Sequence, residues 1–242
     1  MFPFRAPPVI VGHRGAPREA PENTPEGFAV AASVGAQWVE LDVRRSGDGV
    51  AVVHHDPWTA DGVAVVDRDG AALRQAGLHG LDEVLDRLPA GVGVDVDLKN
   101  LPGEPDYDEA GAVAGIAAEA LRPRVGQRPL LVSSFNPATL VAVAELLPDV
   151  PTGLLHAPAS SVAAAQEVAL ELGARVLCSH VGAAGMSSAG IGGAHAAGLA
   201  VLVWPVDDVQ RARALAAAGA DALCTNDPRL LVRALRARRE RL

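Results

Sequence analysis

Residues 162–204, VAAAQEVALELGARVLCSHVGAAGMSSAGIGGAHAAGLAVLVW, contain one unit twice: an Ala-rich helical segment, a glycine and a short apolar run. The apolar residues of the first segment that share one helical face are Val162, Ala165, Ala169 and Leu172. Gly173 and Gly198 stand just before the two apolar runs, and glycine there tolerates the left-handed backbone that ends a helix. The stretch predicts helices that alternate with parallel strands.

The same unit recurs along the whole chain. Strands are expected at 9–12, 38–43, 92–98, 130–134, 152–155, 175–178, 200–204 and 222–224. Gly35 and Gly219 repeat the helix-ending glycine. Eight units favour closure into a barrel over an open sheet, and 242 residues suit a (β/α)₈ barrel, which has typically ~250 residues. We therefore predict the α/β class and a single TIM-barrel domain over residues 1–242.

One segment departs from the alternation of strands and helices. Between Glu40 and Asp56 there is no room for a helix, and residues 46–49 (Ser-Gly-Asp-Gly) are a turn signal. Residues 40–45 and 50–55 are predicted to form an antiparallel hairpin on the barrel's rim, with residue 55 roughly opposite residue 40. Residues 57–80 have weak periodicity and are expected to form a small cap or loop insertion over the barrel mouth.

The composition limits the classes of partner. Hydrophobic residues make up 49% and charged residues 21% of the chain, which indicates a folded, core-forming protein. A net charge of −8 argues against nucleic-acid or anionic-membrane partners, and the basic cluster 233–241 is interpreted as the solvated face of a final helix. No run approaches the ~18 apolar residues of a membrane span. We expect a cytoplasmic protein with two buried, reduced thiols, Cys178 and Cys224.

Ionisable residues gather where the predicted strands end. Those residues are His13 and Arg14 after the first strand, Glu40 and Asp42 on the second, Asp95, Asp97 and Lys99 on the third, and His54 to Asp56 on the hairpin. Residues two apart on a strand face the same side, so the acids of each strand point together. In a barrel of this type the working residues lie at the carboxyl ends of the strands. The sequence therefore predicts one polar site at the barrel mouth.

These residue types suit the chemistry of phosphodiesters. Carboxylate oxygens are the ligands that Mg²⁺ and Ca²⁺ prefer. A cation and a guanidinium can offset the charge on non-bridging phosphate oxygens in the transition state. Two imidazoles can supply an acid and a base near neutral pH. Lys99, the only lysine of the chain, lies beside these acids and invites a role in binding phosphate or metal ligands.

A set of short motifs follows in order along the chain: His13-Arg14-Gly15, Glu22-Asn23-Thr24, Glu40-Leu41-Asp42, His55-Asp56, Asp97-Leu98-Lys99, Ser134-Phe135, Trp204 and Thr225-Asn226-Asp227-Pro228. This ordered set resembles that of the glycerophosphodiester phosphodiesterase family. The resemblance spans about residues 9 to 230. Position 97 carries Asp where the family usually has Glu. Glu22-Asn23-Thr24-Pro25 also reads as a helix start, with Thr24 as the N-cap.

The resemblance implies a role for each of ten residues. It implies that Glu40, Asp42 and Asp97 bind one divalent cation, Mg²⁺ or Ca²⁺, and that His13 and His55 are the general acid and base. It implies that Arg14 and Lys99 hold phosphate oxygens, that Glu22 orients Arg14 or a metal-bound water, and that Phe135 and Trp204 line the floor for the glycerol or head group. The implied reaction converts a glycerophosphodiester, a small molecule, into glycerol 3-phosphate and an alcohol, either by direct attack of water or through a cyclic phosphate.

Other functions are compatible with parts of this pattern. A lysophospholipase-D-like enzyme or a phosphodiester lyase would act on lysophospholipids, and a barrel retained as a binding module would lack catalysis. A sugar isomerase barrel would need His and Glu ligands from later strands, which offer few acids here. Asp95 is interpreted as structural and His54 as a surface or packing residue. His180 is equally compatible with substrate contact and with a solvated loop. The leaving alcohol and the oligomeric state are not predicted.

Overall fold

The fold is a closed barrel of parallel strands, seen in a computed structural model that describes residues 3–4 and 8–239. The eight barrel strands are β1 (Val9–Gly12), β2 (Trp38–Arg45), β5 (Gly93–Leu98), β6 (Leu130–Ser134), β7 (Thr152–His156), β8 (Val176–His180), β9 (Ala200–Trp204) and β10 (Ala222–Thr225). They pair in the order in which they are given, and β1 also pairs with β10, which closes the barrel. The predicted (β/α)₈ barrel is confirmed, with strand ends that differ from the prediction by at most two residues.

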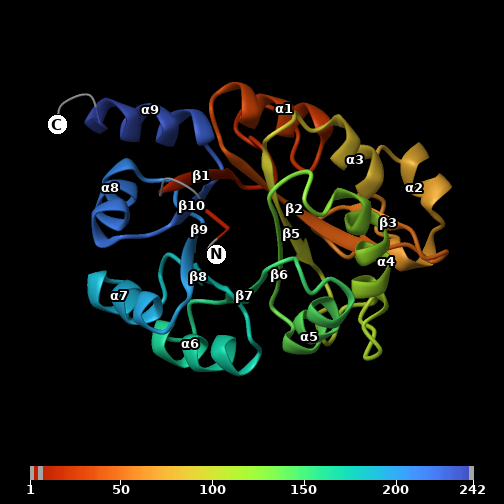
Figure 1. Cartoon of the computed structure of the whole chain (residues 1–242). Helices are drawn as coiled ribbons and strands as arrows, with labels where there is room; N and C mark the ends of the chain where they lie inside the picture. Colours follow the sequence, from red (N-terminus) through yellow and green to blue (C-terminus); the bar gives the residue numbers. More distant parts are fainter. Residues whose placement is uncertain (1–2, 5–7, 240–242) are drawn as a thin grey trace.

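Helices form the outer layer, as Figure 1 shows. They are α1 (Pro25–Ser33), α3 (Leu81–Arg87), α4 (Ala112–Leu121), η2 (Arg122–Arg124), α5 (Pro137–Leu146), α6 (Val162–Glu171), α7 (Ser188–Ala196), α8 (Val209–Ala218) and α9 (Pro228–Arg239). The predicted helix-ending glycines Gly35, Gly173, Gly198 and Gly219 all have positive φ, between +67° and +101°. Thr24 caps α1 by accepting from the amide of Gly27, as predicted. On α9, Arg233 and Arg236 are exposed, whereas Arg241 of the basic cluster lies outside the described residues.

Two apolar layers hold the barrel together. Alternate residues of β1 illustrate them: Ile10 packs against the helices, whereas Val9 and Val11 fill the barrel interior. The interior is closed at the end where the strands begin, because Phe4 packs edge-on against Trp38 with ring centroids 5.2 Å apart. The interior cluster at this end of the barrel is therefore apolar, and the charged side chains of the cavity lie towards the carboxyl ends of the strands.

Gly93 is required by the packing of this closed end. A Cβ atom added at Gly93 would overlap the indole ring of Trp38 on the neighbouring strand. We expect Gly93→Ala to lower the free energy of unfolding by about 1–3 kcal/mol, the usual effect of overpacking. Gly115, in the middle of α4, has nothing within 4 Å of an added Cβ. Gly115→Ala should therefore raise the free energy of unfolding by about 0.5–1 kcal/mol. Urea denaturation measures both, and a destabilised Gly115→Ala would contradict this account.

The predicted hairpin is present, with a register shifted by one residue. β3 (Ala51–Val53) runs antiparallel to β2, pairing Val43 with Val53, and the amide of His54 donates to the carbonyl of Asp42 at 3.0 Å. Continuing this ladder places residue 55 opposite residue 41, so the predicted pairing with residue 40 is wrong. The reason lies in the turn: Gly49 has φ +79°, which makes a three-residue loop of residues 47–49 instead of a two-residue one.

Residues 57–80 contain more structure than predicted. They include η1 (Val65–Asp67), α2 (Gly70–Gln75) and β4 (His79–Gly80), and β4 pairs with β3. The amide of Gly47 donates to the carbonyl of Arg68 at 2.7 Å, and the amide of Gly70 donates to Asp48 at 2.9 Å. Figure 1 shows α2 at the outer edge of the fold, beside the hairpin. The insertion therefore extends and supports the hairpin from outside the barrel.

Candidate active site

A cavity of about 210 Å³ opens at the carboxyl ends of the strands. It is lined by His13, Arg14, Glu40, Asp42, His55, Asp95, Asp97, Lys99, Ser133, Phe135, Leu155, Leu202, Trp204 and Cys224. Nine of the ten residues predicted for the site are in this list, and Glu22 lies outside it. The barrel brings them together because the parallel strands all end at this rim.

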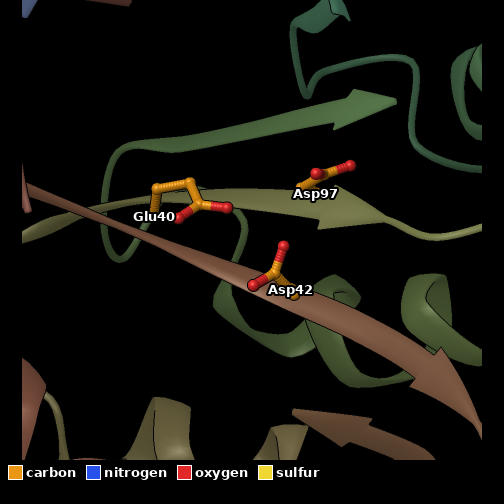
Figure 2. Close-up of side chains that lie close together, drawn as sticks. All are labelled: Glu40, Asp42 and Asp97. Atoms are coloured by element: carbon orange, nitrogen blue, oxygen red, sulfur yellow. The ribbon is translucent and has the colours of Figure 1, made fainter. Parts of the chain in front are cut away.

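Three buried carboxylates lie close together in the cavity. Glu40 and Asp42 of β2 and Asp97 of β5 offer oxygens that lie within 4.8 Å of one another. Figure 2 shows the three side chains pointing into one space from the two neighbouring strands. Burial, and then the neighbouring carboxylate charges, raises the pKa of Glu40 well above its usual range. A cluster of acids at this distance needs positive charge to remain ionised.

Lys99 supplies part of that charge. Its Nζ lies 2.7 Å from Oδ1 of Asp42 and 2.5 Å from Oδ2 of Asp97. Burial by itself would raise the pKa of Asp42, but the ammonium of Lys99 and the guanidinium of Arg14 hold it well below its usual range. For Asp97, burial outweighs the attraction of Lys99 and raises the pKa. The single positive charge of Lys99 thus offsets only part of the negative charge of Asp42 and Asp97.

The donor set fits a hard divalent cation. Oδ1 of Asp97 is buried and has no hydrogen-bond partner among the described residues. Among the described residues, neither Lys nor Arg lies within ion-pair distance of Glu40, and Nε2 of His13 lies 3.9 Å from its Oε2. Buried carboxylate oxygens that converge on one point are the arrangement that Mg²⁺ and Ca²⁺ sites use. The residues present are therefore compatible with the predicted cation.

Two residues with strained backbones hold the carboxylates in place. Arg14 has φ 51° and its amide donates to Oε2 of Glu40 at 2.8 Å. Asn23 has φ 57°; its Nδ2 donates to Oδ2 of Asp42 at 2.8 Å, and the amide of Asp42 donates to its Oδ1 at 3.2 Å. The sequence analysis assigned no role to Asn23, although it lies inside a quoted motif. Positive φ at two non-glycine residues of a single site marks a geometry that the surrounding contacts maintain.

The Arg14 guanidinium lies between two acids. Its Nη1 donates to the carboxylate of Glu22 at 3.1 Å, and its Nε lies 3.2 Å from Oδ2 of Asp42 without hydrogen-bond geometry. Glu22 is half-exposed, with 48% of its side chain accessible, and touches Arg14 from outside the cavity. This placement suits a residue that orients the guanidinium instead of one that meets the substrate.

His13 is held from behind by a chain of hydrogen bonds. Its Nδ1 lies 2.7 Å from Oδ1 of Asn226, and Nδ2 of Asn226 donates to the carboxylate of Asp207 at 2.6 Å. Because the amide NH₂ faces a carboxylate, the amide oxygen is left to accept the Nδ1 proton of His13, and Nε2 keeps its lone pair. Burial lowers the pKa of His13, which favours this neutral form. No role for Asn226 or Asp207 was predicted; the sequence signal for Asn226 was its place in the motif at 225–228, and Asp207 carried none.

His55 enters the cavity from the end of the hairpin. Its Nδ1 lies 2.7 Å from Oδ1 of the exposed Asp56, and 37% of its side chain is accessible. The hydrogen bond with His55 lowers the pKa of Asp56. His54 does not line the cavity; its Nε2 lies 3.1 Å from the carbonyl of Trp58. Only one of the two adjacent histidines thus belongs to the site.

Aromatic rings form one wall. Phe135 and Trp204 meet edge to face with centroids 5.6 Å apart, and Nε1 of Trp204 donates to the carbonyl of Cys178 at 2.9 Å. His180 also packs against Trp204, with ring centroids 5.1 Å apart, but does not line the cavity. Asp95 lies lower; its carboxylate accepts from Ser133 at 2.8 Å, and burial raises its pKa to about 8. The two cysteines are buried and unbridged, as expected.

His156 is a buried histidine outside the cavity whose titration the structure predicts. Neither ring nitrogen has a hydrogen-bond partner among the described residues, and burial lowers its pKa. As the pH falls below about 6.5, His156 is therefore protonated in the unfolded chain before it is protonated in the folded protein. The free energy of unfolding then decreases. We expect the wild type to lose free energy of unfolding more steeply than His156→Gln between about pH 7 and pH 5. Denaturant melts at several pH values test this, and parallel curves would contradict it.

Among the described residues, no helix combines the length and the apolar character that a membrane crossing requires.

The sequence matches a family model, the glycerophosphoryl diester phosphodiesterase family, over residues 13–230. A glycerophosphodiester phosphodiesterase of Caldanaerobacter subterraneus subsp. tengcongensis is 26% identical, over 94% of this chain and 98% of that protein.

Solved structures share the architecture along nearly the whole chain. A phosphodiesterase from Oleispira antarctica, solved in complex with the product sn-glycerol-3-phosphate, has a TM-score of 0.80 and 27% identity, covering 95% of this chain and 97% of that one. The glycerophosphodiester phosphodiesterase of Thermotoga maritima has a TM-score of 0.76 and 23% identity, covering 93% and 97%; at that identity the likeness concerns the fold.

Proposed function

Because the chain belongs to the glycerophosphoryl diester phosphodiesterase family, and is thus a phosphoric diester hydrolase, we propose that it converts small glycerophosphodiesters into glycerol 3-phosphate and an alcohol. Glycerophosphocholine and glycerophosphoethanolamine are the substrates we propose to test first. The observation that carries the proposal is that one cavity combines three convergent carboxylates, two cationic side chains and two imidazoles. No other described part of the chain combines these groups.

Glu40, Asp42 and Asp97 are the residues that would hold the proposed divalent cation, Mg²⁺ or Ca²⁺. When bound, the cation supplies positive charge that offsets the negative charge on the phosphodiester oxygens. The support comes from the convergent, buried oxygens and from the unpartnered Oδ1 of Asp97. Lys99 and Arg14 already lie on the same wall and add positive charge on which phosphate oxygens can bind.

Proton transfer falls to the two imidazoles in this proposal. His13 keeps a lone pair on Nε2 because Nδ1 is hydrogen-bonded to Asn226, and this suits a general base that removes the proton of the nucleophile. His55 is held through Nδ1 by the carboxylate of Asp56 and lines the same cavity, and this suits a general acid that protonates the leaving alkoxide. The same base and acid roles apply whether the nucleophile is water or the substrate's own glycerol hydroxyl.

A metal-restoration assay tests the proposal. Protein stripped of metal with a chelator is given Mg²⁺ or Ca²⁺ and incubated with glycerophosphocholine, glycerophosphoethanolamine or lysophosphatidylcholine, and glycerol 3-phosphate and choline are measured. We expect release of glycerol 3-phosphate from the two deacylated substrates with at least one cation, and none without.

Two outcomes would contradict the proposal. Choline release from lysophosphatidylcholine alone would favour the lysophospholipase-D-like alternative. Turnover that is equal with and without metal would remove the proposed role of the three carboxylates.

A further inference from the structure

Arg44 is a buried charge that the proposed chemistry does not use. It follows Glu40 and Asp42 on the same face of β2, but it does not line the cavity. Only 1% of the residue is accessible. A fully buried guanidinium is costly unless it is paired on several sides, so its partners indicate what it holds together.

Its partners lie in the loop between β5 and α4. Nη1 donates to Glu104 at 2.9 Å and to both carboxylate oxygens of Asp106 at 2.8 and 2.9 Å. The side chain of Asp106 is completely buried, whereas 24% of Glu104 is accessible. This loop is fastened at its base as well, because Asn100 exchanges hydrogen bonds with the backbone of Asp108. The loop is thus a rigid support for the guanidinium.

Another donor of Arg44, Nε, reaches the backbone of the proposed acid. Its Nε donates to the backbone carbonyl of His55 at 2.7 Å. The β2–β3 ladder has ended by that point, with its last bond at the amide of His54. The His55 imidazole itself is partly exposed and bonds only to the exposed Asp56 among the described residues. An exposed pair of this kind fixes a side chain weakly. The buried contact that sets the position of His55 is therefore the one from Arg44.

We propose that Arg44, held by Asp106 and Glu104, is a positioning residue for His55. Resting on the proposed function, this inference makes the β5–α4 loop part of the catalytic machinery through a backbone hydrogen bond. Arginine suits the task because its rigid fork binds carboxylates with one edge while Nε points elsewhere. A lysine keeps the charge but cannot satisfy the carboxylates and the carbonyl of His55 together.

Arg44→Lys is the central test. A displacement of about 1 Å at a catalytic group can cost about 100-fold in rate, so we expect kcat to fall by about 10- to 100-fold. KM and the affinity for Mg²⁺ or Ca²⁺ should change by less than about threefold, because the cavity wall and the three carboxylates are untouched. Thermal unfolding and circular dichroism confirm that the variant is folded. If Arg44→Lys does not fold, Glu104→Gln replaces it in the test, because Glu104 is the partly exposed partner of Arg44. We expect kcat of Glu104→Gln to fall by about 10-fold.

The matched control is Arg124→Lys. Arg124 also bridges two acids, Asp82 and Asp86, at 2.7 and 2.6 Å, but it lies away from the cavity. We expect its kcat to equal that of the wild type.

A double-mutant cycle separates positioning from general loosening of the structure. In the His55→Ala background, Arg44→Lys should lower the residual rate by less than about twofold, since it has no imidazole left to position. An unchanged kcat in Arg44→Lys, or an equal fall in both backgrounds, overturns the inference while leaving the proposed function intact. An inactive wild type, or a fully active His55→Ala, instead overturns the proposed function.

Discussion

Replacement of His13 by alanine is expected to lower kcat by about 10²- to 10⁴-fold, the usual contribution of a general acid or base. The physical reason is that the hydrogen bond between Nδ1 and Asn226 leaves the Nε2 lone pair of the neutral His13 imidazole free to accept a proton. The affinity for the cation should stay close to that of the wild type, because the three carboxylates remain. Steady-state kinetics and calorimetric titration with Mg²⁺ and Ca²⁺ measure the two effects separately.

His79→Ala is the matched control for this experiment. His79 is likewise partly buried and lies 3.2 Å from a carboxylate, that of Glu83, but it is on β4, outside the cavity. Its kcat should match the wild type. Retained turnover in His13→Ala would be fatal to the assignment of His13 and would leave His55 and water as the proton carriers.

Glu40→Gln should weaken cation binding before it affects anything else. Even the loss of an outer hydrogen-bond partner of a metal ligand costs about 10- to 100-fold in affinity, so removal of a direct carboxylate should cost at least that much. Glutamine keeps an oxygen that can accept from the amide of Arg14, so the local backbone should stay in place. The activity lost at low cation concentration should return in part at high concentration.

Asp95→Asn provides the comparison within the same cavity. Asp95 is as buried as the three proposed ligands, but its carboxylate is bound to Ser133 and it is not among the convergent oxygens. We expect a much smaller change in affinity than for Glu40→Gln. Equal losses in the two variants, measured by titration calorimetry, would place the cation elsewhere in the cavity.

The sequence predicted the barrel because each local signal agreed with the global fold. The glycines at 35, 173, 198 and 219 end helices by a conformation that only glycine adopts easily, and such signals are legible without tertiary information. The prediction that the site residues lie together was possible because the parallel strands of a barrel all end at one rim. The hairpin register was wrong by one residue because the difference between a two- and a three-residue loop depends on Gly49 alone.

The supporting contacts could not be predicted for a different reason. Asn226, Asp207 and Arg44 act on residues that are distant in the sequence, up to 213 positions away in the case of His13 and Asn226. The spacing of these residues in the sequence has no period that would reveal the contacts. A single arginine on a strand also does not indicate burial, because its acidic partners are known only from the fold. Only the folded geometry shows which amide or guanidinium faces which imidazole.

Lys99 has a consequence for the folding of the protein without a bound cation. The buried ammonium of Lys99 forms ion pairs with Asp42 and Asp97 and reduces the repulsion between these acids of two neighbouring strands. If the proposed cation is the cofactor, we expect the barrel to fold without it, so that removal of the cation should abolish turnover while the fold is kept.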